Sequence, residues 1–400
     1  MAFFLFLLAI KCENVPLNNK KLSEKTLTVN KYHAVDRIQL AKDIDALQKE
    51  LLSNTNIDDF KHLKKIERWG RICTGLGYAT AWIIPNPISA YLISQGNFTR
   101  WTTVAHHILH RGYDKIEGIP THYTSKGFAK GWRRYFDWLD WMYPAAWDTE
   151  HNDIHHYHLG EEIDPDQVEF NMEKLRQSNI PTWGRYALLA IMAASWKIIY
   201  YASSTLTEYR AIQAKEQGGK RNQISRADMW NPLKPAGKDL WLSCMLPYGI
   251  VQFGVIPMLF LTFGAVAATN VLINTIIAEI FTNLHSFLVI GPNHTGEDVM
   301  MFDEKAKGKG EFYLRQIVGS VNYPSGTNVL DFLHGWLNYQ IEHHLWPEMT
   351  ANQYQKAQPL VKAICEKHNI PYIQESVFTR LRKTLDVMVG KTSMLRPAII

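Results

Sequence analysis

The sequence predicts an all-α integral membrane protein in which clustered histidines flank the apolar segments. Three features predict it: a long uncharged run, a second such run nearer the N-terminus, and three groups of histidines. Composition alone does not, because 400 residues with 46% hydrophobic side chains would also suit roughly two or three soluble domains. The prediction therefore depends on how charge and histidine are distributed along the chain.

The longest uncharged run, Leu240–Ala278, predicts a pair of membrane-crossing helices. Its 39 residues contain no Asp, Glu, Lys, Arg or His. Because one crossing needs about 20 residues, this length allows two. We therefore expect a helical hairpin here that passes through the bilayer and returns.

A second apolar run, Ile72–Thr99, allows two interpretations. It is either one long crossing or two shorter ones, because Pro85 and Pro87 interrupt it and favour a turn. The preceding segment Lys61–Arg71 is rich in Lys and Arg, which prefer the cytosolic side of a membrane. We therefore expect the N-terminal region to be cytosolic.

Other segments predict helices and loops outside these runs. Trp183–Thr205 is apolar, but Arg185 and Lys197 leave only eleven uncharged residues between them, which indicates an interfacial or packed helix. Asp303–Arg315 is expected to be a charged loop before a soluble C-terminal region with helical patterning. The region from about Leu22 to Lys65 predicts polar helices with apolar residues at helical spacing, namely Ile38, Leu40, Ile44, Leu47 and Leu51.

Charge and cysteine content exclude several classes of protein. The net charge of +5 is modest, and no basic block suits nucleic acid. The basic residues between Lys126 and Arg134 lie among Trp and Tyr, which suits a membrane interface or a solvated helix face beside an aromatic stripe. The four cysteines form no CxxC pair, so neither a zinc ribbon nor a disulfide framework is indicated. The apolar start Met1–Ile10 is too short to span, and a degenerate signal, a surface anchor and a misplaced start codon all stay open.

The sixteen histidines are strongly grouped. On a helix, residues i and i+4 share a face, so His106 and His110 can approach one metal, as can His151 and His155. The first group also contains His107, which points about 100° away and is the weaker candidate. The remaining candidates are His156 and His158 in the second group, His343 and His344 with Gln340 in the third, and His285 and His294 after the apolar hairpin.

The number of histidines indicates a site with two metal ions. Imidazole suits zinc, copper, iron and nickel. A catalytic zinc usually takes about three protein ligands, so eight or nine histidines exceed what one zinc needs. Two irons held mostly by neutral histidine can activate oxygen for attack on an unreactive C–H bond. An acyl chain beside the membrane would be a fitting substrate.

Taken together, the motifs resemble those of the integral-membrane fatty acid desaturases. They are HxxxH at His106 and His110, HxxxHH at His151–His156, and QxxHH at Gln340–His344. The resemblance covers roughly residues 72–350, and Gln340 at the start of the third motif is similar to the front-end acyl desaturases. The stretch Pro292–His294 is also similar to that group and favours His294 over His285 as an additional ligand.

The resemblance implies about four transmembrane helices and a cytosolic helical cap that holds two iron ions. It implies that the metal ligands are His106, His110, His151, His155, His156, His294, His343 and His344, with His107, His158, His285 and Gln340 as weaker candidates. It further implies that O2 and two electrons are consumed while an acyl chain gains a cis double bond. Asp148, Asp164, Asp166, Asn338 and Glu342 are plausible partners of the ligands, although each could equally be a cap or surface group.

The sequence departs from many front-end desaturases because it contains no HPGG motif of a fused haem-binding domain. The electron donor is therefore expected to be a separate protein, either a b-type cytochrome or a ferredoxin with its reductase. We expect a cytosolic or peripheral segment over residues 1–70, a desaturase domain over 71–350 and a cytosolic segment over 351–400. Both the endoplasmic reticulum and a bacterial inner membrane suit such a protein.

Two rival functions stay open at the level of the sequence. A fatty-acyl or sphingolipid hydroxylase would use the same class of site to insert oxygen. A metal transporter or receptor-like scaffold is the non-enzymatic rival, but transport sites lie near the membrane midplane and Leu240–Ala278 contains no ionisable residue. The third motif favours desaturation over hydroxylation.

Overall fold

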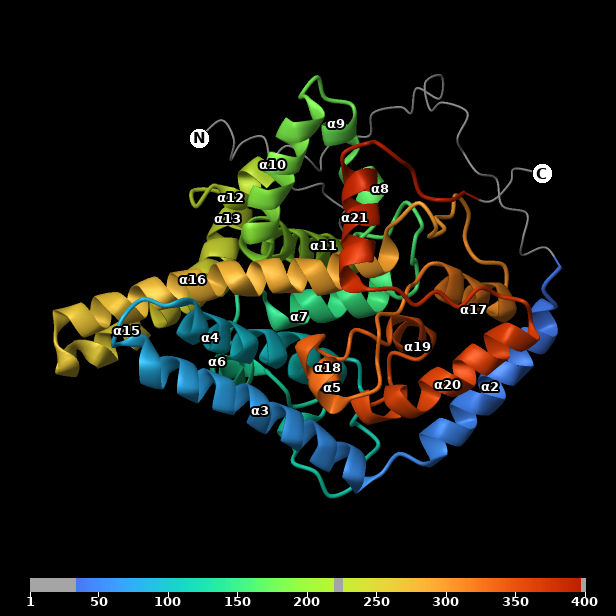
Figure 1. Cartoon of the computed structure of the whole chain (residues 1–400), viewed down its shortest axis with the longest axis horizontal. Coiled ribbons are helices and arrows are strands. Elements are labelled where there is room, and N and C mark those ends of the chain that lie inside the picture. Colours follow the sequence, from blue (N-terminus) through green and yellow to red (C-terminus); the bar gives the residue numbers. More distant parts are fainter. Residues whose placement is uncertain (1–33, 219–225, 397–400) are drawn as a thin grey trace. The chain divides into compact units, whose positions relative to one another are not determined.

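The computed structural model describes residues 34–218 and 226–396 (Figure 1). Within these ranges the regular structure is helical apart from three isolated β-bridges, which confirms the all-α prediction. The described chain forms two compact units. Unit one comprises Ile57–Glu150 and Ala190–Phe287, and unit two comprises residues 34–56, 151–189 and 288–396. Met1–Ile10, about which the sequence left three alternatives, lies outside the described residues.

Unit one contains a tight antiparallel helix pair, α3 (Ile57–Ala81) and α4 (Pro87–Thr99). Glycines let the two backbones approach closely, since a Cβ on Gly77 would lie 2.7 Å from the Ile93 side chain. The Asn86 side chain caps α4 by accepting a hydrogen bond from the Ser89 N–H at 2.8 Å. The break expected at the two prolines is therefore confirmed, with one proline at the first position of α4.

Helix α4 continues into a π-helical stretch, η2 (Arg100–Ala105), and then into α5 (His106–Leu109). A π-helical turn forms i→i+5 hydrogen bonds and is often found at functional sites in helices. Here it lies directly before the first histidine group, so it sets the direction in which those side chains leave the helix.

Among the residues that the structure describes, two helices are long and apolar enough to cross a membrane, Pro235–Phe263 and Ala265–His294. They meet at Gly264, whose φ of 102° is readily adopted only by glycine. This confirms the pair of long apolar helices predicted from Leu240–Ala278. The first helix joins α13 (Pro235–Leu240), η7 (Trp241–Met245), α14 (Leu246–Ile250), η8 (Val251–Val255), α15 (Ile256–Leu259) and η9 (Phe260–Phe263), and the second contains α16 (Ala265–Ile290) and η10 (Gly291–His294).

A third, bent helix pair also passes the apolar criterion. It consists of α10 (Thr182–Ala194) and the stretch Lys197–Glu216, which are bent by 77° relative to each other. That stretch contains η6 (Lys197–Tyr201) and α11 (Ala202–Glu216). The described residues therefore offer two spans, or three if the bent pair counts as one, so the expected number of four stays a prediction.

A buried polar network links the elements of unit one. The Lys197 side chain is fully buried and its ammonium lies 2.8 Å from a carboxylate oxygen of Asp140, which is 5% exposed. Glu279 on α16 accepts hydrogen bonds from Trp141 Nε1 at 2.6 Å and from the Tyr248 hydroxyl at 2.9 Å. The sequence allowed Trp183–Thr205 to be an interfacial or a packed helix, and the burial of Lys197 supports the packed helix.

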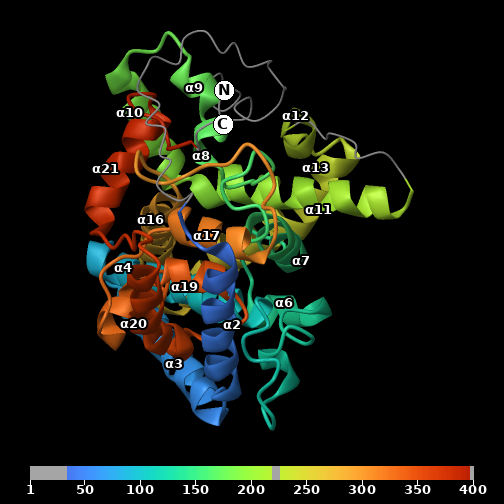
Figure 2. The ribbon, with the colours of Figure 1, turned by 90° about the vertical axis from the view of Figure 1, so that its right-hand side faces the viewer.

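Unit two is built around α2 (Arg37–Ser53) and α20 (Ala351–Lys367), which lie side by side in both views (Figures 1 and 2). Of the five apolar residues at helical spacing along α2, Leu40 and Ile44 are fully buried, and Leu47 and Leu51 are nearly so. The fifth, Ile38, differs from them, because its side chain is 73% exposed at the first turn of the helix.

The segment expected to be a charged loop is partly helical. Its second half begins α17 (Lys309–Val318), in which Arg315 pairs with Glu311 at 2.6 Å one turn earlier. Charged residues at this spacing stabilise a helix, so the charge density that suggested a loop instead supports a helix.

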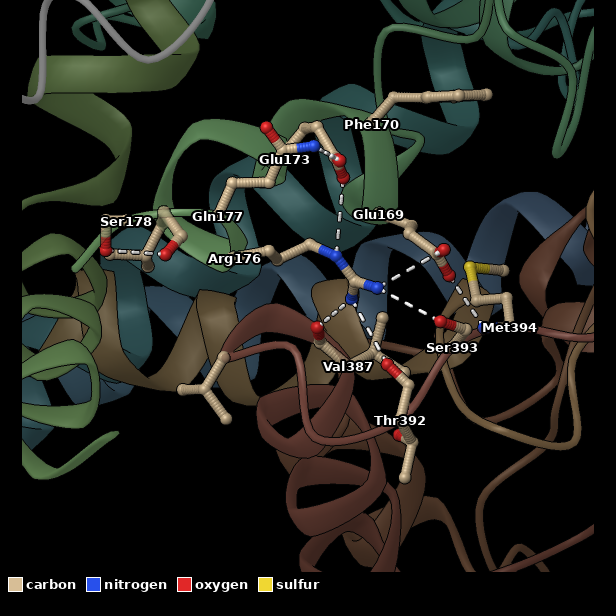
Figure 3. A network of polar contacts seen from close by, with 12 residues as sticks. Glu169, Phe170, Glu173, Arg176, Gln177, Ser178, Val387, Thr392, Ser393 and Met394 are labelled. Atoms are coloured by element: carbon tan, nitrogen blue, oxygen red, sulfur yellow. Dashed lines mark hydrogen bonds and ion pairs between the residues drawn. The ribbon is translucent and has the colours of Figure 1, made fainter. Parts of the chain in front are cut away.

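The chain after the second histidine group is tied to the C-terminal segment through Arg176 (Figure 3). Its guanidinium donates to the Val387 carbonyl, to the Thr392 carbonyl at 3.2 Å and to Ser393 Oγ at 3.1 Å. It also pairs with Glu169, which accepts a hydrogen bond from the Met394 N–H at 2.7 Å. The elements joined here are α8 (Val168–Asn171), α9 (Glu173–Arg176) and the end of α21 (Val377–Met388).

The other short helices connect these elements. They are η3 (Thr121–Tyr123), η4 (Gly131–Arg133), α6 (Arg134–Asp137), α7 (Pro144–Trp147), η5 (Asp148–His155), α12 (Arg226–Trp230), α18 (Asn328–Leu333) and α19 (Gln340–Leu345).

Candidate metal centre

The first histidine group lies in unit one on α5. His106 and His110 are one turn apart, with ring centroids 4.7 Å from each other, and both rings contact Trp147 edge-on. One ring nitrogen of His106 lies within 4.8 Å of one ring nitrogen of His110. His107 is also buried, but its Nδ1 donates to the Thr103 carbonyl at 2.8 Å. The pairing of His106 with His110 is therefore the one expected from the i, i+4 spacing.

The second group is arranged by the π-helical stretch η5. The His156 N–H donates to the His151 carbonyl at 3.2 Å, an i→i+5 bond. As a result the rings of His151 and His156 approach, with their Nε2 atoms 3.3 Å apart. His155 lies beside them at a ring separation of 5.3 Å from His151. His158 is directed elsewhere, because its Nδ1 lies 2.8 Å from the Glu161 carboxylate.

Unit two brings five histidines of the second and third groups together with His294. Nitrogens of His155, His294 and His344 lie within 4.8 Å of one another. A second set has nitrogens equally close. It contains His151, His156 and His343.

Within unit two these histidines lie in η5, at the residue directly after it, in η10 and in α19. The two sets touch, because the rings of His156 and His344 stack at 4.3 Å. Two adjacent sets of three nitrogen ligands are an arrangement suited to two metal ions.

The ring nitrogens that face away from these sets are held by specific partners. His155 Nδ1 donates to Asp164 Oδ1 at 2.8 Å, His344 Nδ1 donates to Gln316 Oε1 at 3.1 Å, and His343 Nδ1 lies 3.1 Å from the Tyr354 hydroxyl. Such partners fix the tautomer and orientation of a metal-binding imidazole. The arrangement leaves Nε2 of each ring as the atom available to a metal.

Asp164 is itself held in place by backbone donors. Its carboxylate accepts hydrogen bonds from the Gly160 N–H at 2.8 Å and the Asp166 N–H at 2.9 Å. Gly160 has a φ of 72°, so the turn uses a conformation that other residues rarely adopt. The motif after the second histidine group therefore builds a cradle for the carboxylate that orients His155.

The electrostatic environment shifts the pKa values of His344 and His155 in opposite directions. Burial, together with the surrounding histidines, holds the pKa of His344 well below its ordinary value, so this ring stays neutral and able to bind a metal. Burial also acts to lower the pKa of His155, but the Asp164 carboxylate outweighs it and raises that pKa. A stronger base is a stronger ligand, since the carboxylate increases electron density on the ring.

The buried polar atoms of the donor set fit a bound metal. His344 Nε2 is buried and has no hydrogen-bond partner within residues 34–218 and 226–396. An isolated buried acceptor of this kind is costly, so a ligand for it is expected. Clustered neutral imidazoles, with an acceptor nitrogen directed inward, fit a first-row transition metal such as iron.

His294 and Gln340 contact each other directly. Gln340 Nε2 donates to His294 Nε2 at 2.8 Å, while Gln340 Oε1 accepts from the Asn293 side chain at 3.2 Å. His294 Nδ1 donates to the Gly319 carbonyl at 3.2 Å. His285 lies on α16 in unit one, where its ring stacks on Phe98 at 3.9 Å.

Of the acidic and amide residues considered as partners of the ligands, Asp164 has the clearest contact. Asp166 is 3.9 Å from His155 Nδ1, and Asp148 lies 3.9 Å from Arg111. Glu342 accepts from Asn322 at 2.8 Å and from Tyr372 at 2.8 Å, while the Asn338 amide donates to Asp331 at 2.5 Å. Sequence reasoning missed Gln316 and Tyr354, because no motif marks them and only tertiary packing brings them to the rings.

Comparison with known proteins agrees with the geometry. Residues 80–376 match the fatty acid desaturase family. An NADPH-dependent stearoyl-CoA 9-desaturase of Mycobacterium tuberculosis is 22% identical over 356 residues, covering 86% of this chain and 77% of the relative.

Shorter matches include two further desaturases. The Delta(5) fatty acid desaturase A of Dictyostelium discoideum is 28% identical over 28% of this chain and 25% of its own length. The Delta(8)-fatty-acid desaturase 1 of Arabidopsis thaliana is 31% identical over 22% of this chain and 18% of its own length. The chain belongs to the fatty acid desaturase family and is an oxidoreductase.

Proposed function

We propose that this protein is an oxygen-dependent acyl-lipid desaturase that introduces a cis double bond into a fatty acyl chain. The buried, inward-directed Nε2 of His344 among five further imidazoles is the observation that carries the proposal. In the balanced reaction, two adjacent methylenes lose two hydrogens, and O2 is reduced to two waters with two electrons and two protons from a donor.

The proposed ligands of two irons are His106, His110, His151, His155, His156, His294, His343 and His344. The inclusion of His106 and His110 rests on the HxxxH motif and its place in the family pattern. The irons, when bound, supply the activation of O2 that an unreactive C–H bond requires. His107, His158 and His285 are weaker candidates, because each has a hydrogen bond or stacking contact outside the two sets of nitrogens.

The chain itself would contribute orientation and exclusion of water. Asp164, Gln316 and Tyr354 hold three imidazoles by their Nδ1 atoms, so that the opposite nitrogens converge. The six histidines of the two sets in unit two are buried or nearly so, which keeps bulk water from the reacting carbon. Gln340 is also a weaker candidate, and its amide nitrogen lies 2.8 Å from His294 Nε2, the atom that His294 would offer to a metal in place of this contact.

We place the protein in a membrane as a multi-pass protein with its metal centre on the cytosolic side. Two helices, or three with the bent pair, support membrane insertion by their length and apolar character. The cytosolic orientation rests on the positive residues of Lys61–Arg71. A separate b-type cytochrome or ferredoxin is the proposed electron donor.

A lipid profile would test the proposal. The chain and its His155→Ala/His156→Ala variant would be expressed in a host of defined fatty acid content, and the acyl chains compared by gas chromatography–mass spectrometry. A new unsaturated chain that appears only with the intact protein supports desaturation. A new hydroxylated chain would instead favour the rival hydroxylase, which uses the same class of ligands.

A further inference from the structure

The turn η10 ends at His294, one of the proposed metal ligands. The next residue, Thr295, already has an extended backbone, with a φ of −137° and a ψ of 134°. A helix that ends leaves its last carbonyl groups without partners in the helix. Asn293 and Thr295 are fully buried, so bulk water does not reach this part of the chain. The backbone around His294 therefore needs hydrogen-bond donors from elsewhere in the protein.

Arg380 supplies donors on both sides of His294. It lies on α21, and its side chain is fully buried within unit two. Its Nη2 donates to the Thr295 carbonyl at 2.8 Å, and its Nε donates to the Pro292 carbonyl at 3.4 Å. The Thr384 hydroxyl, one turn further along α21, donates to the same Thr295 carbonyl at 3.0 Å. One helix thus holds the main chain before and after this histidine.

The backbone next to His294 is fitted to this guanidinium. A Cβ on Gly296 would lie 2.3 Å from Arg380 Nη2, which is closer than side chains approach, so the glycine leaves the space that the guanidinium occupies. Between the two contacts of Arg380, the Asn293 carbonyl accepts a hydrogen bond from the Val321 N–H at 2.9 Å. Carbonyl groups on both sides of the histidine are therefore held by defined donors.

The charge of Arg380 is balanced through its remaining nitrogen. Nη1 lies 2.6 Å from Asp298 and 3.3 Å from Glu375, and Lys383 pairs with both carboxylates at 2.7 and 2.8 Å. A buried charge is costly unless it is paired, and these carboxylates provide the pairing. A guanidinium presents its N–H donors in a fixed fork, whereas an ammonium is a single centre. Arginine can therefore hold the ion pairs and the two carbonyl groups at the same time.

Helix α21 is itself anchored at its other end. Arg176 donates to the Val387 carbonyl (Figure 3), and Arg185 donates to the Val389 carbonyl at 2.7 Å. All of these residues belong to unit two. The helix therefore gives Arg380 a fixed base from which to hold the turn.

The position of the main chain matters for His294 because its ring has modest support of its own. Its Nδ1 donates to a neutral partner, the Gly319 carbonyl, at 3.2 Å. His155 donates to a carboxylate at 2.8 Å instead. A metal ligand is effective when it is held within about 0.5 Å of its productive position. For His294, the clamp on the backbone supplies that precision.

We infer that Arg380 is a positioning residue of the metal centre, which holds the main chain on both sides of His294 and so sets the place from which this imidazole reaches a metal. The inference rests on the proposed function, in which His294 is a ligand. The family match covers residues 80–376, so α21, which begins at Val377, lies beyond it. The C-terminal helix, expected from the sequence to belong to a separate cytosolic segment, thereby takes part in building the metal site.

Cobalt binding to the metal-free, full-length protein in an uncharged detergent would test the inference. Histidine sites bind Co²⁺ more tightly than Fe²⁺, and its visible absorption depends on the number and arrangement of its ligands. Affinity is measured by competition with a chelator, and the absorption spectrum is recorded at saturation. The variants are Arg380→Gln, Arg380→Lys, His294→Ala and the double variant Arg380→Gln/His294→Ala. Arg382→Gln is the matched control, since Arg382 is exposed on the same helix.

Arg380→Gln is expected to bind cobalt about ten-fold more weakly and to change the spectrum in the same direction as His294→Ala. Arg380→Lys keeps the charge but not the fork, so its affinity should lie between those of Arg380→Gln and the unaltered protein. Arg382→Gln should match the unaltered protein. The double variant should bind no more weakly than His294→Ala, because the effect of Arg380 passes through that ring.

Two results would overturn the inference. One is an unchanged affinity and spectrum in Arg380→Gln. The other is a double variant whose loss equals the sum of the two single losses, since a residue that only stabilises the fold would act independently of His294. Melting temperatures of the metal-free variants show which of them fold. If Arg380→Gln does not fold, the comparison is made with Arg380→Lys and its double variant with His294→Ala.

Cobalt binding requires no turnover, so its outcome is separate from that of the lipid profile. Binding that depends on both His294 and Arg380, without any unsaturated product, would retain the inference and remove the proposed function. An unsaturated product together with binding that depends on His294 alone would do the reverse.

Discussion

Asp164 holds His155 by accepting a hydrogen bond from its Nδ1 at 2.8 Å, and both side chains are 2% exposed. The carboxylate is in turn fixed by the backbone N–H groups of Gly160 and Asp166. One acidic residue therefore determines which nitrogen of His155 is available to a metal. The turn that contains Gly160, Asp164 and Asp166 therefore contributes, together with the second histidine group, to positioning a metal ligand.

Asp164→Asn is expected to lower iron affinity by about 10- to 100-fold, because His155 loses its carboxylate partner. Iron per chain would be measured by elemental analysis after dialysis against a series of chelator concentrations. Glu162→Gln is the matched control, since Glu162 is exposed in the same turn. Equal iron retention by the two variants would contradict the assigned role of Asp164.

Tyr354→Phe is expected to destabilise the third histidine group. The Tyr354 hydroxyl lies 3.1 Å from His343 Nδ1 and donates to the Trp346 carbonyl at 3.0 Å. Its removal leaves two buried polar groups without this partner, at a cost of about 1–3 kcal/mol. Thermal unfolding followed by fluorescence should show a melting temperature lower by a few degrees. Tyr157→Phe, at a ring 65% exposed, should leave it unchanged, and equal shifts would refute the prediction.

Residue patterns predicted those features that depend on neighbours along the chain. Helical spacing marked Leu40, Ile44, Leu47 and Leu51, which lie on one buried face because the face of a helix follows from its period, while Ile38 of the same set is exposed. The long apolar helices followed from the absence of charge over Leu240–Ala278. The histidine groups were found because their spacing is itself the chemical signal.

Features created by tertiary packing or irregular backbone were not predictable in this way. Gln316 reaches His344 from α17, and a glutamine in an unremarkable helix has no sequence mark of such a role. The close approach of His151 and His156 depends on an i→i+5 turn, whereas the sequence argument assumed regular α-helical geometry. The charge of the segment before Arg315 suggested a loop, although its Glu311–Arg315 spacing supports a helix.

Lys197→Met is expected to destabilise unit one strongly. The substitution would leave the buried Asp140 carboxylate without its cation, and breaking a buried pair typically costs about 3–5 kcal/mol. The double variant Lys197→Met/Asp140→Asn should recover part of this loss, because no uncompensated charge remains. Lys215→Met, at an exposed position on α11, is the control. A double variant no more stable than Lys197→Met would show that the pair does not account for the effect.

Acid is expected to weaken the contact between α21 and the segment after η10 through Asp298. Asp298 pairs with the fully buried Arg380 at 2.6 Å and with Lys383 at 2.7 Å. Burial acts to raise the pKa of Asp298, but these two cations outweigh it and hold that pKa below its ordinary value. Since the folded pKa is the lower one, the carboxylate stabilises the fold above the unfolded pKa of about 4. That stability is lost as the pH falls through the folded value.

Asp298→Asn should therefore melt at a lower temperature than the unaltered protein at pH 7, and the difference should shrink at pH 3. Iron-free protein is used at both pH values, so that loss of metal does not contribute to the shift. Asp303→Asn is the matched control, because its side chain lies in the same connection and is 52% exposed. A difference between Asp298→Asn and the unaltered protein that stays constant from pH 7 to pH 3 would mean that the charge of Asp298 does not stabilise the fold.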